Sequence, residues 1–228
     1  MTVPKYFRKT GERAISSFDY LDIVDGTGMV EFDLAVTSYG NKQILTTQST
    51  QIYSSLIETA DIYDSTPTSD STKSMDEDFD LTAFTTPRNI KGTGLMSFTW
   101  KTSNDGTGTK YTDTYINVIV KRVSGATETT VGTGRTALER TAAGGSSRQT
   151  ETIYLTLTDT HFAAGDILRV TVESWTSREG GIELYPNQTT VIAHDPQNRD
   201  GTIIKPSTDT APVSITKTKI WIPFKIDL

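Results

Sequence analysis

Apolar and polar residues alternate along much of the chain, with the two-residue period of a β-strand that buries one face. In residues 30–38, Val30, Phe32, Leu34 and Val36 share one face, and polar or small residues occupy the other. The same pattern recurs in residues 78–83, 114–122, 151–157, 167–174 and 219–227. Residues 95–100 form a short mixed run that is also typical of a strand. Residues 44–49, 51–57 and 189–193 are weaker candidates.

Clusters of Gly, Asp, Asn and Ser between these segments predict turns, at residues 25–28, 103–106, 144–147 and 200–201. Nothing longer than a turn or two has a helical period, and Thr, which favours strands, is abundant. About nine or ten strands with long connections predict an all-β, antiparallel two-sheet β-sandwich, with a jelly roll as the leading topology. The polar stretches 62–80 and 132–148 predict exposed loops, the second of them mobile.

The beginning of the chain differs from the rest and predicts an extended N-terminal arm. We assign residues 1–20 to this arm and residues 21–228 to the sandwich domain. Residues 1–13 carry a local charge of +3 in a chain whose net charge is −6. One interpretation is a frayed tail. The other is an arm that docks on an acidic neighbour through its basic and aromatic side chains: Lys5, Tyr6, Phe7, Arg8, Lys9 and Arg13.

Composition excludes several classes of function. The chain contains no cysteine, which excludes disulfides, zinc fingers and cysteine nucleophiles. Its acidic character, with a sequence pI near 5.0, argues against nucleic-acid binding. No apolar run approaches the roughly 20 residues that span a bilayer, and the N-terminus has no signal-peptide pattern. We therefore expect neither nucleic acid nor membrane as a partner.

Candidate catalytic and metal-binding residues are few. His161 lies in a predicted turn, in which Gly165 takes the tight position and Asp166 caps the backbone, and His194 precedes Asp195. No Gly-x-Ser-x-Gly elbow accompanies them. The carboxylates between Asp76 and Asp80 lack the spacing of a calcium loop. We therefore predict no catalytic, cofactor-binding or metal-binding residues and a protein that is not an enzyme.

The glycine pairs and the tryptophans are better explained by structure than by ligand binding. Glycine pairs such as Gly132 and Gly134 lack the lysine and helix of a phosphate loop and are interpreted as flexible β-turns. The three tryptophans, Trp100, Trp175 and Trp221, fit core or interface packing better than sugar stacking.

Four segments together resemble structural proteins of environmental tailed phages. They are FDYLDIVDGTG (residues 18–28), THFAAGDILRVTV (160–172), HDPQNR (194–199) and WIPFK (221–225). The resemblance implies a virion protein of β-sandwich or jelly-roll type, assembled in the host cytoplasm, with capsid or other virion proteins and further copies of itself as partners. It brings no catalytic residues and no cofactor. In the HDPQNR segment, Arg199 is a candidate contact with a carboxylate of the same or a neighbouring subunit.

These observations predict a capsid-associated structural protein, such as a decoration, auxiliary or minor capsid protein. The alternatives are a tail-associated or fibre-associated protein, and a carbohydrate-binding module that contacts the host surface.

Overall fold

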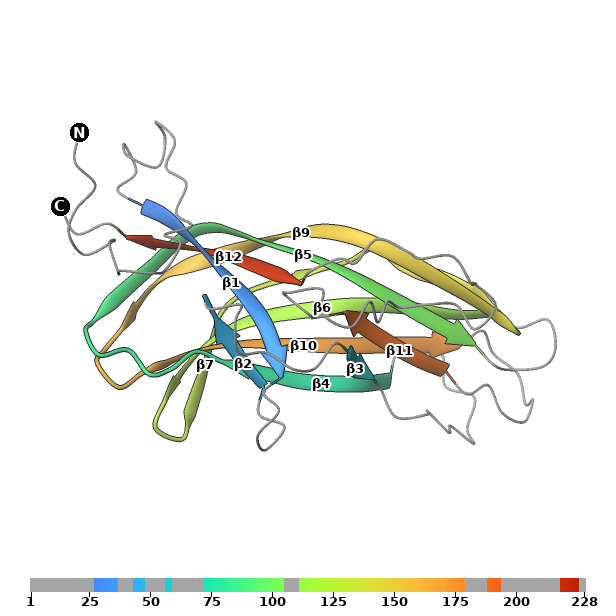
Figure 1. The fold of residues 1–228 in the computed structure, drawn as a ribbon, viewed down its shortest axis with the longest axis horizontal. Helices are drawn as coiled ribbons and strands as arrows, with labels where there is room; N and C mark the ends of the chain where they lie inside the picture. Colours follow the sequence, from blue (N-terminus) through green and yellow to red (C-terminus); the bar gives the residue numbers. More distant parts are fainter. Residues whose placement is uncertain are drawn as a thin grey trace.

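A computed structural model describes residues 27–36, 43–47, 56–58, 72–104, 111–178, 188–193 and 218–225. All the regular structure in these residues is β-strand (Figure 1). The strands are β1 (Thr27–Val36), β2 (Gln43–Thr46), β3 (Leu56–Glu58), β4 (Thr72–Asp80), β5 (Arg88–Asn104), β6 (Tyr111–Ser124), β7 (Thr127–Arg135), β8 (Glu139–Ala142), β9 (Gly145–Phe162), β10 (Ile167–Arg178), β11 (Gln188–Ala193) and β12 (Lys219–Lys225). The predicted all-β content is therefore correct.

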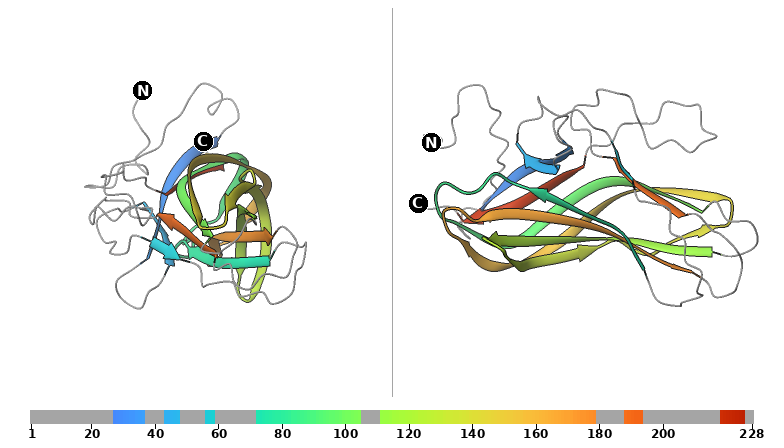
Figure 2. Two further views of the ribbon diagram at one scale, coloured as in Figure 1. Left: turned by 90° about the vertical axis from the view of Figure 1, so that its right-hand side faces the viewer. Right: turned by 90° about the horizontal axis from the view of Figure 1, so that it is seen from below.

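The strands form one sheet that closes on itself, so the predicted two-sheet antiparallel sandwich is wrong. The ring runs β12-β1-β2-β4-β10-β6-β7-β9-β5 and returns to β12 through the pairing of β12 with β5. The view along the long axis shows the strands curled around a common centre (Figure 2). The barrel is mixed, because β2 and β4 pair in parallel at Ile44 and Asp80. Period-two alternation shows which face of a strand is buried, but it does not show whether the two edges of a sheet meet.

Two long strands make closure possible because each changes its partner along its length. The 17-residue β5 pairs with β9 on one side, and with β12 and then β11 on the other. The 18-residue β9 pairs with β5 and also meets β7 at Gly132 and Thr133. There the backbones are very close: a Cβ on Gly132 would lie 2.3 Å from the carbonyl oxygen of Thr156. Glycine is therefore required at this crossing.

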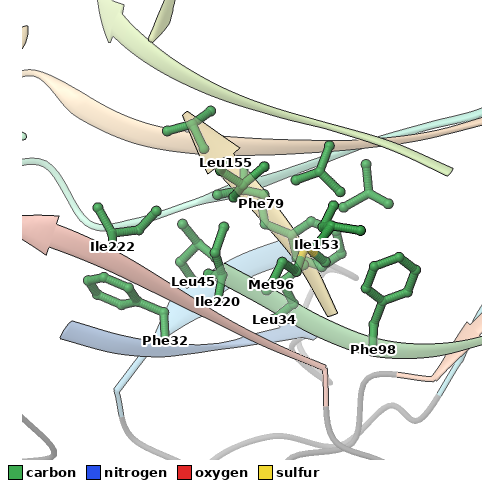
Figure 3. Packing of buried hydrophobic residues seen from close by; sticks show 14 of the residues in the cluster. Phe32, Leu34, Leu45, Phe79, Met96, Phe98, Ile153, Leu155, Ile220 and Ile222 are labelled. Atoms are coloured by element: carbon green, nitrogen blue, oxygen red, sulfur yellow. The ribbon is translucent and has the colours of Figure 1, made fainter. Parts of the chain in front are cut away.

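The barrel interior is filled by apolar side chains from nearly every strand of the ring (Figure 3). Phe32 and Leu34 come from β1, and Ile220 and Ile222 from β12. Further buried residues come from the long strands, namely Met96, Phe98, Ile116, Val118, Val120, Ile153, Leu155, Leu168, Val170 and Val172. For all of these positions except Met96 and Phe98, which lie in the mixed run 95–100, the sequence pattern placed the side chain on a buried strand face, and that prediction is confirmed.

Both segments predicted to be exposed loops contain strands. Residues 72–80 form β4, which pairs with β10 and buries Met75 and Phe79. Residues 132–148 contain the end of β7, all of β8 and the start of β9. Their polar composition reflects positions on outer faces and at one end of the barrel rather than a lack of pairing. The predicted turn before β10 is confirmed: Gly165 has φ 93° and the Asp166 carboxylate accepts from the Ala163 backbone N–H at 2.9 Å.

Candidate functional site

One end of the barrel interior is polar, at the end where β5 and β10 finish (right in Figure 1). Here the inward-facing positions carry hydroxyl and amide groups in place of aliphatic ones. The buried polar residues are Thr102 and Asn104 of β5, Thr112 and Thr114 of β6, Thr141 of β8, Ser174 and Thr176 of β10, and Thr190 of β11. Burying polar groups costs free energy unless they form hydrogen bonds, so a buried polar cluster of this kind is a candidate binding site.

At this end β8 and β9 lie beside each other without a backbone ladder. β8 pairs with β6, whereas the first half of β9 pairs with β5. Side chains bridge the seam: the Ser147 hydroxyl donates to Oε1 of Glu139 at 2.5 Å, and Nε2 of Gln149 donates to the Ser147 oxygen at 3.3 Å. Glu139 stands opposite the buried Thr114 in the register of β8 with β6. The seam therefore carries a half-buried carboxylate at the mouth of the barrel.

A second half-buried carboxylate, Glu151, lies on β9 near the first. The indole Nε1 of Trp100, whose side chain is fully buried, donates to Oε1 of Glu151 at 3.2 Å. Burial raises the pKa of Glu151 above its ordinary value, the hydrogen bond from Trp100 opposes this, and the negative charge of Glu139 raises the pKa further. A raised pKa at a partly accessible carboxyl is typical of a functional site.

Neither carboxylate forms an ion pair with a basic side chain of the described residues. Arg148 lies between Gln149 and Ser147 in sequence, but it pairs with Lys101 in the register and so belongs to the opposite face. Arg140, next to Glu139, is bonded to Asp113 at 2.8 and 2.9 Å. Glu139 and Glu151 are therefore two neighbouring negative charges, and neither has an ion-pair partner among the described residues, although two guanidinium nitrogens of Arg148 on the other face of β9 are buried without a bond.

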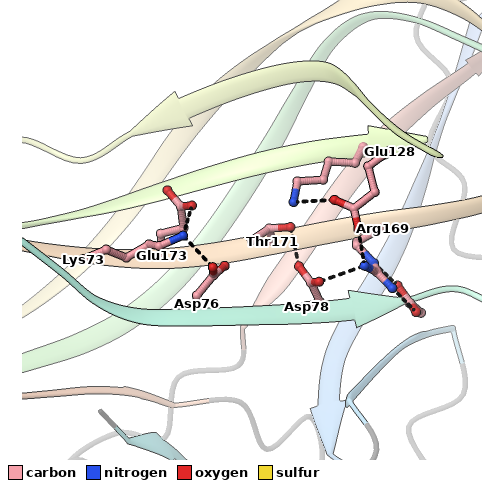
Figure 4. A network of polar contacts seen from close by, with 9 residues as sticks. Lys73, Asp76, Asp78, Glu128, Arg169, Thr171 and Glu173 are labelled. Atoms are coloured by element: carbon pink, nitrogen blue, oxygen red, sulfur yellow. Dashed lines mark hydrogen bonds and ion pairs between the residues drawn. The ribbon is translucent and has the colours of Figure 1, made fainter. Parts of the chain in front are cut away.

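A larger set of charges within the described residues lies elsewhere, on the outer face of β4, β10, β6 and β7 (Figure 4). Arg169 donates from Nε and Nη2 to Asp80 at 2.7 and 2.9 Å, and from Nη1 to Asp78 at 2.9 Å and to Glu128 at 2.6 Å. The carboxylates of residues 76–80 thus have protein partners, since Asp76 bonds Lys73 and Glu77 bonds Gln43. This face is a network of matched charges that ties four strands together.

The same face continues into a row of stacked side chains. Tyr115 and Trp175 lie parallel, with ring centroids 6.4 Å apart, and Arg135 and Lys73 cover the two ends. Burial raises the pKa of Glu173 beside this row, but hydrogen bonds from Asn117, Trp175 and Lys73 outweigh it and hold the pKa below its ordinary value. All these polar groups bond one another, so we interpret the row as part of the scaffold.

Replacement of Arg169 by glutamine should lower the free energy of unfolding at pH 7 by about 1–3 kcal/mol, because three carboxylates would then face one another without their common partner. The matched control is Arg140→Gln, which breaks the pair of a mostly exposed arginine with Asp113 and should cost less than about 1 kcal/mol. Urea denaturation measures both. Lys121 and, to a smaller extent, Arg169 hold the pKa of Glu128 below its ordinary value. The stabilisation that Glu128 gains from these two partners is therefore fully present when the pH is above the ordinary pKa of a glutamate, and it disappears as the pH falls through the lowered pKa. Equal costs for the two variants would contradict a special role for Arg169.

Replacement of Glu151 by glutamine should stabilise the protein at pH 7, by up to about 1 kcal/mol, because the ionised carboxylate is half-buried and faces Glu139. The raised pKa means that folding favours the protonated form, so the gain should vanish as the pH falls below the ordinary pKa of a glutamate. Thermal unfolding of both forms between about pH 3.5 and 8 measures this. If Glu151→Gln lowered the stability at pH 7, the ionised carboxylate of Glu151 would not be destabilising the folded protein.

The residues predicted to contact partners, Lys5, Tyr6, Phe7, Arg8, Lys9, Arg13 and Arg199, lie outside the described residues, as does His194. His161 is described and exposed, and its Nδ1 lies 2.7 Å from the side-chain oxygen of Asn89. Within the described residues no serine hydroxyl bonds to it. Sequence reasoning missed Glu139 and Glu151. One signal was present: Glu151 has the same parity as the inward residues Ile153, Leu155 and Leu157, which puts a carboxylate on a buried face.

Among the described residues, no helix is long and apolar enough to cross a membrane. No group of three or more His, Asp or Glu side chains in that part of the chain is placed to hold a metal ion.

No protein-family model and no curated protein matches the sequence. Solved structures do share the arrangement of strands. An aminopeptidase from a marine sediment archaeon, Thaumarchaeota archaeon, matches with TM-score 0.51 and 13% identity, over 86% of this chain and 37% of that chain. An α-amino acid ester hydrolase matches with TM-score 0.47 and 14% identity, over 84% and 36% of the two chains. A CocE/NonD family hydrolase from Staphylococcus aureus has TM-score 0.41 and 11% identity, over 85% and 36%.

This chain thus spans little more than a third of the length of these structures, and at such identities the likeness is one of fold. It nevertheless overturns two predictions. The archaeal aminopeptidase, which matches with TM-score 0.51, is a hydrolase, and it represents none of the roles predicted from the sequence, whether on the capsid, on a tail or fibre, or as a carbohydrate-binding module. The prediction of a non-enzyme is contradicted by the same comparison. Those predictions relied on composition and a presumed sandwich, and fold class does not determine function.

Proposed function

We propose that this chain is the β-domain of a hydrolase, of the peptide-cleaving class that the archaeal aminopeptidase represents. The observation that carries the proposal is the match of the barrel over 86% of this chain with TM-score 0.51. The match covers 37% of the aminopeptidase, so we place part of the catalytic machinery on a separate domain or subunit. The arrangement at His161 supports this division, because its near partner in the described residues is an amide and not a serine.

In this proposal the polar mouth of the barrel is the part of the chain that faces the substrate. Glu139 and Glu151 lie there, half-buried and without a basic partner among the described residues. The charged outer face of β4, β10, β6 and β7 keeps the barrel rigid while the mouth remains free to bind. Sites at the mouths of β-barrels are common because the walls are fixed and the inward side chains converge.

The test uses the full chain carrying an affinity tag, expressed in its own host. Complexes isolated on the tag are treated with a fluorophosphonate probe, which labels serine hydrolases, and assayed with amino-acid p-nitroanilides. We expect one labelled protein in a fixed ratio to the tagged chain, and turnover that depends on the complex. Turnover by the purified chain alone would place the chemistry on this chain and contradict the division. The lack of both labelling and turnover in the complex would overturn the hydrolase proposal.

We also propose that this hydrolase belongs to the particle of a tailed phage, with other virion proteins and further copies of the chain as its partners. The support is the resemblance of four segments to phage structural proteins. Two of these segments, residues 160–172 and 221–225, lie largely in the strands β9, β10 and β12. Mass spectrometry of purified particles tests the location. Absence of the chain from particles that are made in infected cells would refute it and leave the hydrolase proposal untouched.

A further inference from the structure

We propose that Glu139 and Glu151, at the seam between β8 and β9, bind a ligand that carries a primary ammonium group. The inference deepens the proposed function by naming a ligand class, but its measurement does not need the hydrolase assembly. The first step is the charge balance. Glu139 accepts from Ser147 and Glu151 accepts from Trp100, both neutral donors. Two neighbouring carboxylates that are half-buried, and whose bonding partners among the described residues are neutral, favour a bound cation.

The second step is an unused polar group beside the carboxylates. Thr141 lies two residues after Glu139 on the same face of β8 and is 3% exposed, and its Oγ1 has no hydrogen-bond partner in the described part of the chain. Its backbone carbonyl accepts from Asn104 at 3.4 Å and from the Thr112 hydroxyl at 3.5 Å, which places the residue inside the polar end of the barrel. A buried hydroxyl without a partner is costly, and a donor from a ligand would satisfy it.

The number of acceptor groups at the site indicates which kind of cation it can bind. An ammonium group has three donors, and the groups beside the seam that can accept them are the carboxylates of Glu139 and Glu151 and the unpartnered hydroxyl of Thr141. A calcium ion takes six to eight oxygens and a magnesium ion needs near-octahedral geometry. No group of three or more His, Asp or Glu side chains in the described residues is placed for a metal ion. Donor count therefore favours an organic ammonium over a divalent metal.

The nearby basic groups do not occupy the site. Arg140 on β8 is bonded to Asp113. Arg148 on β9 and Lys101 on β5 are opposite each other in the register, on the face of the strand pair that points away from Trp100 and Glu151. The side chains that do face the two carboxylates from β5, β6 and β9 are neutral: Trp100, Thr114, Ser147 and Gln149. No basic side chain of the described residues forms an ion pair with either carboxylate, so an incoming ammonium would meet no competitor from that part of the chain.

The test follows the indole N–H resonance of Trp100 in the full 228-residue chain, assigned with Trp100→Phe, because this group bonds directly to Glu151. Butylammonium chloride is titrated at pH 7, with butanol as the neutral molecule of equal shape and calcium chloride as the metal. We expect a saturable shift with butylammonium and neither of the others. The double variant Glu139→Gln/Glu151→Gln keeps the shape of both side chains and should weaken binding by at least about tenfold.

Glu128→Gln is the matched control, since Glu128 is a carboxylate of the outer face that is already paired with Lys121 and Arg169. It should bind butylammonium as the unaltered chain does. Equal shifts with butanol, saturation by calcium instead of butylammonium, or unchanged binding in the double variant would each overturn the proposal. These outcomes leave the hydrolase proposal standing, because its readout is labelling and turnover in the complex. If labelling and turnover were absent while butylammonium still bound, the hydrolase proposal would fail and the ammonium site would stand.

Discussion

Replacing Phe79 by alanine should lower the free energy of unfolding by about 3–5 kcal/mol, which we expect to be the largest effect of a single side-chain truncation in β4. Phe79 is fully buried. Its strand pairs along its length with β10, but meets β2 at a single position. Side-chain packing therefore contributes much of the stability that keeps β4 paired within the barrel. Removal of the phenyl ring of Phe79 leaves a cavity, and the neighbouring strands β2 and β10, which pair with β4 to different extents, cannot easily move to close it.

Two matched variants define the origin of this effect. Phe79→Leu keeps most of the volume and should cost no more than about 1.5 kcal/mol. Leu81→Ala truncates a half-buried residue just beyond the end of β4 and should cost less than Phe79→Ala. Urea denaturation with a constant slope measures all three. A cost below about 1 kcal/mol for Phe79→Ala would mean that β4 does not contribute to the interior. That result would agree with an exposed loop over residues 62–80.

Replacing Gly132 by alanine should destabilise the protein by about 2–3 kcal/mol, because the new methyl group would collide with the backbone of β9. The Cβ would lie 2.3 Å from the carbonyl oxygen of Thr156 and 2.7 Å from Cδ2 of Leu157. A leucine side chain can rotate away, but a backbone oxygen in a ladder cannot. The strands β7 and β9 must separate, and their pairing closes the ring at this point.

Gly134→Ala tests the same contact two residues further on, where the Cβ would lie 2.5 Å from the carbonyl oxygen of Tyr154, and should behave alike. Thr133→Ala is the control, because Thr133 is exposed between the two glycines and its truncation leaves the crossing intact. It should cost less than about 1 kcal/mol. Thermal unfolding followed by near-ultraviolet circular dichroism measures the set. If all three variants unfold at the same temperature, the two glycines are not needed for closure.

The candidate site was only partly open to prediction from the sequence. The parity of Glu151 with Ile153 and Leu155 places a carboxylate on the inner face of β9, and this is a local property of one strand. Its proximity to Glu139, by contrast, depends on β8 leaving β9 to pair with β6. The bond from Trp100 depends on the register of β5 with β9. Strand registers between distant segments are set by packing and not by the residues of either segment alone.

The sequence by itself determined that the protein is all-β, where most strands lie and which of their faces are buried, because a period of two is written in neighbouring residues. It also determined the turn at Gly165 and Asp166, since short-range bonds of the backbone decide such turns. Only the tertiary structure decided that the sheet closes into a barrel, that Gly132 and Gly134 serve a strand crossing, and that two carboxylates meet at its mouth. Each of these depends on contacts between segments far apart in the chain, which a local pattern does not encode.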